Sequence, residues 1–381
     1  MTSDNLLWDP YVLIRDHEIK EFWTDVLSKN EKTLFILARG FDPRMNTFTN
    51  AIYESLNENV EFAILNIEGE NGPHTGLSKK NWEELKVKLS KKGIEFRDHE
   101  LEMWKVKKYT KSRVGPNNAV ELINNGLIEG FKHVILDISS IPRAIYFSLL
   151  TAILNHSRKR NENGEEVNVY VNLVENPIVD KSITSDGIDD KAEFIPGLGG
   201  DFLIEHDLVD LEGAEKPKIW IPVLGERQEF KLKKIEELVE PKIICPVLPF
   251  PSSKPRRPDD MLLEYRELLF DSWLVEHENI IYASENNPFE LYRQLIKTIS
   301  RYTEALQPIG GCKIALSTLS SKLISIGAFL SSYELYRVRE ESVGLVHVGG
   351  SAYNYNSSAI ETESAENEYL ITLWLDGSPY N

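Results

Sequence analysis

Cysteine is scarce in this chain of 381 residues, which contains only Cys245 and Cys312. Two cysteines cannot build a disulfide framework or a cysteine-only metal site, so we expect a reducing, cytoplasmic environment. No apolar run approaches the roughly 18 residues that a membrane span requires. The N-terminal segment is acidic and has no signal-peptide apolar core, so we expect no association with membranes.

Positive charge is also in short supply. The chain has 43 Lys and Arg residues against 60 Asp and Glu residues, which gives a formal net charge of −17. An extensive surface for duplex DNA needs clustered Lys and Arg, and this balance argues against one. An anionic small-molecule ligand is compatible with this net charge, because backbone amides and a few local cations suffice to hold phosphates.

Familiar catalytic and metal-binding signatures are missing as well. The chain has no G-x-x-x-x-G-K-[ST] phosphate loop and no G-x-S-x-G nucleophile elbow. Its 8 histidines form no H-x-x-x-H or H-E-x-x-H pair, so we predict no metal site and no cofactor. The sequence identifies no catalytic residue, and only His74 and His347 merit testing as acid–base groups.

What the chain does contain is an alternation of strand and helix patterns. Apolar or β-branched runs predict strands over residues 34–37, 60–67, 94–101, 133–138 and 167–174. Amphipathic helical segments separate them, which is typical of βαβ units and a mostly parallel sheet. The nearly continuous apolar content of ILDI and VNVYVNLV indicates strands that are covered on both faces.

The same order of elements then repeats. Strands are predicted over residues 219–224, 243–248, 280–283, 313–317 and 343–348. Three pairs of landmarks lie 185, 179 and 174 residues apart, namely Gly40 with Gly225, Arg143 with Lys322, and Val169 with Val343. We therefore predict an α/β fold with two Rossmann-like parallel-sheet halves in tandem, related by duplication and packed about a pseudo-twofold relation.

The predicted boundaries place the first half at 1–175 and the second half at 216–381. Residues 176–215 between them are rich in Asp and Glu, and we interpret them as a linker or surface excursion. Their Gly-Leu-Gly-Gly stretch (197–200) lacks the preceding strand and third glycine of a dinucleotide-binding turn. The YLITLWL run (369–375) is expected to add an edge strand to the second half.

Ligands of open parallel α/β sheets bind outside the carboxyl ends of the strands, and this rule points to four loops. Hydroxyl and N–H groups at a helix start, with a cation nearby, make a plausible anion cradle. In the first half, the candidate ligand-binding residues are Gly40, Asp42, Arg44, Asp137, Ser139, Ser140 and Arg143. In the second half, they are Gly225, Arg227, Ser317, Ser320 and Lys322.

The candidate residues could also have purely structural roles. Ser and Asp before a helix are common N-caps that need no ligand. Asp42 and Arg44 could form a local ion pair, and a buried Asp137 would need a partner such as Arg143 or Arg44. Matched cations at Arg143 and Lys322 favour a ligand site, because capping does not require them.

Two basic stretches stand out against the acidic background. Five cations lie between residues 105 and 113, and three lie between residues 254 and 257. These loops are expected at the carboxyl ends of strands, where they could receive phosphates. Lys-rich loops are also commonly just solvated charge. The residues concerned are Lys105, Lys107, Lys108, Lys111 and Arg113, and Lys254, Arg256 and Arg257.

Two segments resemble a known ligand loop. ILDISSIPRAIYFSLLTAIL (135–154) and IALSTLSSKLISIGAFLSSYEL (314–335) each combine a strand, a hydroxyl-rich turn with a cation, and an apolar helix. This arrangement resembles CRISPR-associated Rossmann-fold (CARF) domains, and its duplication resembles SAVED domains. The resemblance implies a nucleotide pocket lined by Ser139, Ser140, Arg143, Ser317, Ser320 and Lys322, with Gly40 and Gly225 in the first-strand loops. The family loop usually carries a glycine before its Thr-Lys, and both loops here lack it.

The resemblance implies that the chain senses a cyclic or short oligonucleotide signal in prokaryotic antiviral defence. Because the two halves occupy nearly the whole chain, a sensor or scaffold would act on a separate effector protein, alone or as a homo-oligomer. A chain that destroys the signal is a related option. A GT-B-like nucleotide-sugar transferase and a non-catalytic structural subunit are the alternatives, and fold alone does not separate them.

Overall fold

The computed structural model describes residues 6–67, 75–107, 110–176, 179–180, 183–186, 189, 191–203, 216–350, 352–355 and 368–380. The chain divides into two compact units. The first-sheet unit comprises Leu7–Ser185 and Ala352–Asn381, and the second-sheet unit comprises Asp186–Ser351 with Met1–Leu6. Among the helices in these residues, none has the length and apolar composition for crossing a membrane.

The first-sheet unit is built on a seven-stranded sheet with the order β1-β18-β8-β7-β2-β3-β4. Its central strands are buried along their whole length, as their continuous apolar content predicts. The five predicted strands are confirmed as a parallel set: β2 (Thr33–Ala38), β3 (Val60–Asn66), β4 (Glu95–Glu100), β7 (His133–Asp137) and β8 (Asn168–Glu175).

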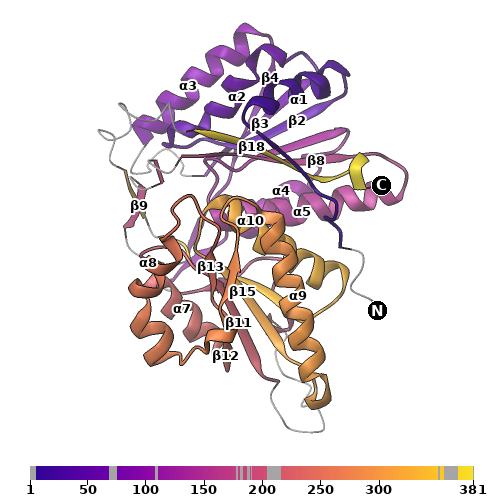
Figure 1. Cartoon of the computed structure of the whole chain (residues 1–381). Coiled ribbons are helices and arrows are strands. Elements are labelled where there is room, and N and C mark those ends of the chain that lie inside the picture. Colours follow the sequence, from indigo (N-terminus) through magenta and orange to yellow (C-terminus); the bar gives the residue numbers. More distant parts are fainter. Residues whose placement is uncertain are drawn as a thin grey trace. The chain divides into compact units, whose positions relative to one another are not determined.

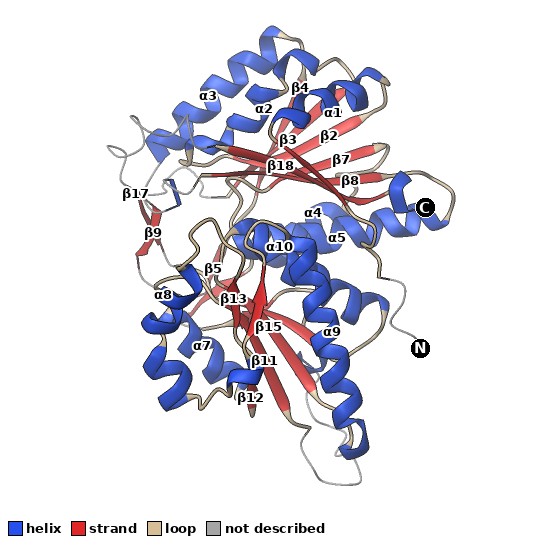
Figure 2. Cartoon of the chain, in the orientation of Figure 1, coloured by secondary structure: helices blue, strands red, loops and turns tan. Residues whose placement is uncertain are grey.

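Helices cover both faces of this sheet (Figures 1 and 2). On one face, Trp23 packs in a cluster with Phe35 and Phe62 of the sheet. On the other face, the helix after β7 is buried from Ala144 to Leu154, which explains why its sequence is apolar almost all round. The first face carries α1 (His17–Ser28), α2 (Thr47–Ala51) and α3 (Thr75–Lys91), and the second carries α4 (Gly115–Asn124) and α5 (Arg143–Glu162).

The C-terminal strand corrects the predicted boundaries. β18 (Tyr369–Asp376) is not an edge strand of the second half, because it lies inside the first sheet. It pairs antiparallel with β8 on one side and with β1 (Val12–Arg15) on the other. Its side chains explain this placement: Thr372 accepts a hydrogen bond from Trp23 and donates one to Asn172, and all three side chains are buried.

The second-sheet unit repeats the parallel core. Its sheet has the order β10-β16-β15-β11-β13-β14, with β12 (Ile243–Ile244) beside β11. The parallel strands are β11 (Lys218–Val223), β13 (Val247–Pro249), β14 (Ile281–Ala283), β15 (Lys313–Thr318) and β16 (Val343–His347). One face carries α7 (Glu229–Val239) and α8 (Arg257–Glu264), and the other carries α9 (Pro288–Leu306) and α10 (Lys322–Ser332) (Figure 1).

The two sheets share one strand order. If the predicted parallel strands of each half are numbered along the chain, both sheets read 5-4-1-2-3, because β8-β7-β2-β3-β4 matches β16-β15-β11-β13-β14. Each sheet also adds an antiparallel strand beside its fifth strand, β18 in one and β10 (Glu193–Phe194) in the other. The predicted tandem of Rossmann-like α/β halves is therefore confirmed for fold class and strand order.

The predicted linker is wrong for part of its length. Residues 193–203 belong to the second-sheet unit, where β10 pairs with β16 and a 3-10 turn, η3 (Gly200–Leu203), follows. Leu345 accepts from the amide of Ile195 at 2.9 Å and donates its own amide to Leu198 at 2.8 Å. Gly200 has a φ of +57° and packs against the backbone of Val343. Glycine at this position therefore lets the chain after β10 approach β16 closely.

Some elements were not predicted. These are β1, α1, the antiparallel hairpin of β5 (Trp104–Lys107) and β6 (Thr110–Arg113), and the pair β9 (Ile183–Asp186) and β17 (Ala352–Tyr355). Two predicted helices end in π-helical segments, η4 (Glu267–Ser272) after α8 and η7 (Tyr333–Val338) after α10. Further 3-10 turns are η1 (Pro43–Met45), η2 (Tyr53–Ser55), η5 (His277–Asn279), η6 (Gln307–Ile309) and η10 (Ser378–Tyr380).

Candidate functional site

The four predicted loops lie at the topological switch points of the two sheets. In the first sheet, the neighbouring strands β2 and β7 are strands one and four, and the chain extends away from them in opposite directions. In the second sheet, β11 and β15 hold the same relation. This is where open α/β sheets bind ligands, outside the carboxyl ends of the strands.

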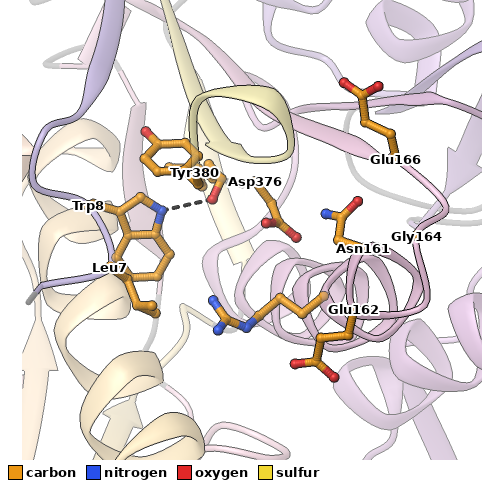
Figure 3. Close-up of a pocket in the computed structure, with 10 residues that line it drawn as sticks. Leu7, Trp8, Asn161, Glu162, Gly164, Glu166, Asp376 and Tyr380 are labelled. Atoms are coloured by element: carbon orange, nitrogen blue, oxygen red, sulfur yellow. Dashed lines mark hydrogen bonds between the residues drawn. The ribbon is translucent and has the colours of Figure 1, made fainter.

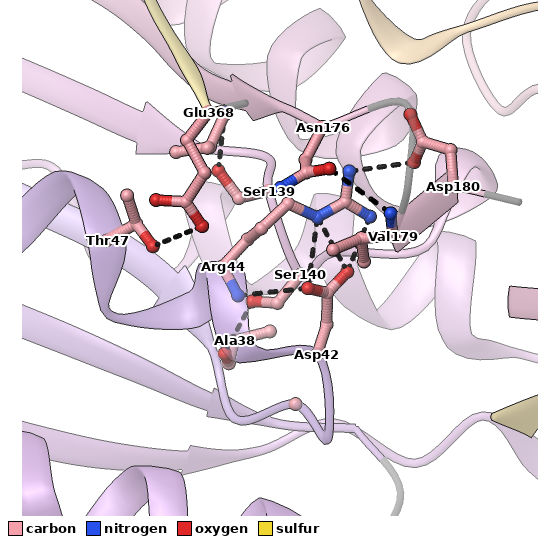
Figure 4. A network of polar contacts seen from close by, with 12 residues as sticks. Ala38, Asp42, Arg44, Thr47, Ser139, Ser140, Asn176, Val179, Asp180 and Glu368 are labelled. Carbon is pink, nitrogen blue, oxygen red and sulfur yellow. Dashed lines mark hydrogen bonds and ion pairs between the residues drawn. The ribbon is translucent and has the colours of Figure 1, made fainter. Parts of the chain in front are cut away.

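In the first-sheet unit, the loops after β2 and β7 are packed against each other. The Ser140 hydroxyl donates a hydrogen bond to the Ala38 carbonyl at 2.7 Å (Figure 4). A Cβ added at Gly40 would lie 2.9 Å from Ser140 Cβ, closer than real Cβ contacts come. Glycine at position 40 therefore permits the close approach of the two loops.

The second-sheet unit repeats this contact more tightly. A Cβ added at Gly225 would lie 2.0 Å from the backbone carbonyl oxygen of Leu319. The Leu319 amide donates to Val223 at 3.0 Å, and the Tyr265 hydroxyl donates to the Gly225 carbonyl. In both units, the glycine after strand one thus allows contact with the loop after strand four.

Asp42 and Arg44 form the local ion pair that was the structural alternative (Figure 4). Arg44 Nη2 donates to Asp42 Oδ2 at 2.7 Å and Nε donates to Oδ1 at 3.0 Å, while Nη1 reaches Asp180 at 2.7 Å. Burial opposes the charge of the guanidinium, but the two carboxylates outweigh it and raise the Arg44 pKa. Both members of the pair are buried, so they stabilise the loop.

Three more candidate residues make hydrogen bonds within the protein, namely Asp137, Ser139 and Ser317. The amide of Ser139 donates to Asp137 Oδ1 at 2.9 Å, and the Ser139 hydroxyl accepts from the Val174 amide at 3.0 Å. Ser317 Oγ accepts from the indole of Trp220 at 2.9 Å. All of these hydroxyl and carboxylate groups are buried, and they position the loops.

Five candidates reach the surface. Arg143 and Lys322 are the first residues of α5 and α10, and both are half-buried, as are Ser140 and Ser320. Arg227 is exposed, has a φ of +59°, and donates its amide to Glu264. The side chains that could meet a ligand at the switch points are therefore chiefly cations.

Sequence reasoning missed a polar network at the carboxyl edge of the second sheet. Arg257 donates from Nε to Glu226 at 3.0 Å and also pairs with Glu285, whose Oε2 accepts from the Ser253 amide at 3.0 Å. The network joins the loops after β11, β13 and β14. Its signal in the sequence is weak, because each residue is simply a charge that follows a predicted strand.

In the first-sheet unit, the missed residues are Asp180 and Glu368. Thr47 donates to Glu368 Oε1 at 3.4 Å (Figure 4), and burial raises the pKa of Glu368. Asp180 lies 136 positions from its partner Arg44, and Glu368 lies 321 positions from its partner Thr47. No local sequence pattern could therefore have revealed them.

The two basic stretches behave differently. Lys254 and Arg256 are exposed in the loop after β13. In the hairpin of β5 and β6, Arg113 lies over the Trp104 ring at 5.0 Å from its centroid. The side chains of Lys107, Lys108 and Lys111, and all of His74, lie outside the described residues. His347 is buried at the end of β16.

A cavity of about 460 Å³ lies near the amino end of β8, at the edge of the first sheet that is opposite to the predicted loops (Figure 3). Trp8 donates its indole N–H to Leu375 at 2.8 Å beside it. None of the predicted site residues lines it; the lining residues are Leu7, Trp8, Arg158, Asn161, Glu162, Gly164, Glu166, Leu375, Asp376 and Tyr380. Within the described part of the chain, no group of three or more His, Cys, Asp and Glu side chains could hold a metal.

Comparison with known proteins adds little to this geometry. No protein-family model matches the chain, and no curated protein matches it. Among solved structures, it is similar to a putative universal stress protein from Pseudomonas aeruginosa UCBPP-PA14, with 11% sequence identity and a TM-score of 0.22. The match covers 84% of this chain and 94% of that chain. At this TM-score, the similarity carries no argument about function.

Proposed function

We propose that this chain is a nucleotide-signal-binding sensor or scaffold subunit of a prokaryotic antiviral defence system, and that it acts on a separate effector protein. One observation carries the proposal: both sheets read 5-4-1-2-3, and both place a cation at the first position of the helix after strand four. The resemblance of residues 135–154 and 314–335 to CARF and SAVED loops supplies the ligand class.

The chemistry of these positions suits an anionic ligand. A helix start presents backbone N–H groups and the positive end of the helix dipole. Arg143 and Lys322 add a full charge at the same point, in a chain whose net charge is −17. An arginine can also donate two parallel hydrogen bonds to one phosphate, which a lysine cannot.

The buried polar groups around these positions favour a binding role over a catalytic one. Asp42, Arg44, Asp137 and Ser139 bond to one another or to neighbouring strands. In the first-sheet unit, they make a rigid frame for the loop that leads into the half-buried Arg143. We therefore assign the chain a sensing role, with the chemistry left to its effector.

Thermal-shift measurements on the full chain test the proposal. A ligand at 100 times its Kd stabilises the folded state by about 2.7 kcal/mol, so we expect a cyclic or short oligonucleotide to raise Tm by roughly 5–10 °C. Arg143→Ala and Lys322→Ala should reduce that shift. Arg266→Ala and Lys297→Ala, which remove exposed cations elsewhere, should leave it unchanged.

Two results would contradict the proposal. A shift produced by sugar nucleotides and not by oligonucleotides would favour a transferase. The absence of any shift across a panel of cyclic and linear oligonucleotides would remove nucleotide sensing altogether.

A further inference from the structure

We propose that Phe250 and Tyr282 form a base-stacking platform, and that Lys254 and Arg256 beside it receive phosphate. The inference rests on the proposed function and adds to it a subsite, outside the four switch-point loops, that recognises the base. It predicts that the ligand needs a nucleobase as well as a phosphate.

The two rings are exposed and in contact. Phe250 directly follows β13, and Tyr282 lies in the neighbouring strand β14, opposite Leu248. Their ring centroids are 6.2 Å apart with planes at 81°. Phe250 is 52% exposed and Tyr282 is 42% exposed. Aromatic side chains usually bury their large apolar area, so a pair that meets at the surface indicates an interaction site.

The strands hold the platform in place. The Phe250 amide donates to the Ala283 carbonyl at 2.8 Å, and the Glu285 amide donates to the Pro251 carbonyl at 2.9 Å. Glu285 Oε2 then accepts from the Ser253 amide at 3.0 Å. Phe250 is therefore fixed on both sides before any ligand binds, which reduces the entropy lost on binding.

Positive charge follows Phe250 closely along the chain. Lys254 and Arg256 are exposed and have no ion-pair partner among the described residues. Arg257, the next residue, is different because Glu226 and Glu285 already neutralise it. An otherwise acidic chain thus places two available cations within six residues of Phe250, one member of the exposed aromatic pair.

This combination fits a nucleotide better than other anions. Every nucleobase has a flat face that stacks on an aromatic ring, and its phosphates are attracted to nearby Lys and Arg. A bare phosphate or sulfate would use the cations but not the rings. An acidic peptide would use the cations as well, and the experiment below includes it as an alternative.

Fluorescence of a 2-aminopurine-substituted oligonucleotide tests stacking directly, because the probe is quenched when it stacks on an aromatic ring. We use the full chain and the oligonucleotide that gives the largest thermal shift. Phe250→Ala and Tyr282→Ala should lose the quenching and weaken binding roughly 5- to 100-fold. Phe250→Trp should keep both. Phe250→Leu, which preserves apolar volume, should behave like Phe250→Ala if the ring is what matters.

A matched control is available on the same unit. Phe230 on α7 is 74% exposed, so Phe230→Ala removes a comparable ring elsewhere and should change nothing. Lys254→Gln with Arg256→Gln should weaken binding and reduce its dependence on salt. Each variant is first checked for an unchanged Tm without ligand.

The outcomes separate this inference from the proposed function. If the oligonucleotide binds and Phe250→Ala and Phe250→Leu bind it as tightly as the wild type, the platform is wrong and nucleotide sensing stands. If no oligonucleotide shifts the wild-type Tm, both fail. If an acidic peptide binds in a Phe250-dependent way and oligonucleotides do not, the surface is a protein-docking site and both are overturned.

Discussion

Arg143 and Lys322 hold the same position in their two sheets. Each is the first residue of the helix that follows the fourth parallel strand, α5 after β7 and α10 after β15. A cation in the first turn of a helix opposes the helix dipole, so helix stability does not explain why both halves have one. The anionic ligand of the proposed function would favour a cation at both positions.

Removing either cation should therefore affect binding more than folding. We expect Arg143→Ala and Lys322→Ala to weaken oligonucleotide binding roughly 10- to 100-fold, because a charge-assisted bond to phosphate contributes on the order of 1.5–3 kcal/mol. Calorimetric titration gives the affinity, and urea unfolding gives the stability. If stability falls together with binding, these side chains support the loops, and if neither changes, the proposed site is wrong.

The Asp42–Arg44 pair should behave in the opposite way. Arg44→Leu leaves the buried Asp42 carboxylate without its partner, and we expect it to lower the free energy of unfolding by about 3–5 kcal/mol. Adding Asp42→Asn should recover much of that loss, since no charge is then left buried. Urea unfolding followed by tryptophan fluorescence measures both. A loss below about 1 kcal/mol for the single variant would show that the pair is not structural.

Gly225 should tolerate no side chain. Gly225→Ala places a Cβ 2.0 Å from the Leu319 carbonyl oxygen, which is backbone and cannot move aside cheaply. We expect a loss of roughly 1–3 kcal/mol in the free energy of unfolding. Gly76→Ala is the matched control, because nothing lies within 4 Å of a Cβ at that position. Equal stability of the two variants would contradict the tight contact between the loops.

Asp376 should make stability depend on pH. Burial raises its pKa, although the Ser157 hydroxyl, which donates to it at 2.6 Å, partly offsets the effect. The folded state therefore holds its proton more tightly than the unfolded state, and this contribution to stability is lost as pH rises through the raised pKa. Asp376→Asn should remove the decline in unfolding free energy that urea titrations show as pH rises above the ordinary Asp pKa of about 3.9. An unchanged pH profile would contradict the raised pKa.

The strands and helices of the two cores were predictable because their patterns are local. VNVYVNLV indicates a strand buried on both faces from its own composition, and β8 is such a strand. The two switch-point glycines were also found, since the repeat of elements placed Gly40 and Gly225 at matching positions. The repeated order of strands and helices thus identified two glycine positions that neither loop sequence would have identified by itself.

Pairings between distant segments were not predictable. The alternation of YLITLWL indicates a strand but does not identify its sheet, and β18 reaches the first sheet through partners such as Trp23, 349 positions away from Thr372. The same limit applies to Asp180, which meets Arg44 across 136 positions. The short spacing of Asp42 and Arg44 suggested a local ion pair as the alternative to a ligand site, but only the fold shows that the pair forms and that Asp180 joins it.

The central claim is that a nucleotide signal binds at the carboxyl edges of the two sheets. Hydrogen–deuterium exchange of the full chain with and without a cyclic oligonucleotide tests this most directly. We predict slower amide exchange at residues 139–146 and 319–326, where the loops after β7 and β15 enter α5 and α10. Protection confined to the cavity near Trp8 and Arg158, or no protection with any oligonucleotide, would contradict the account.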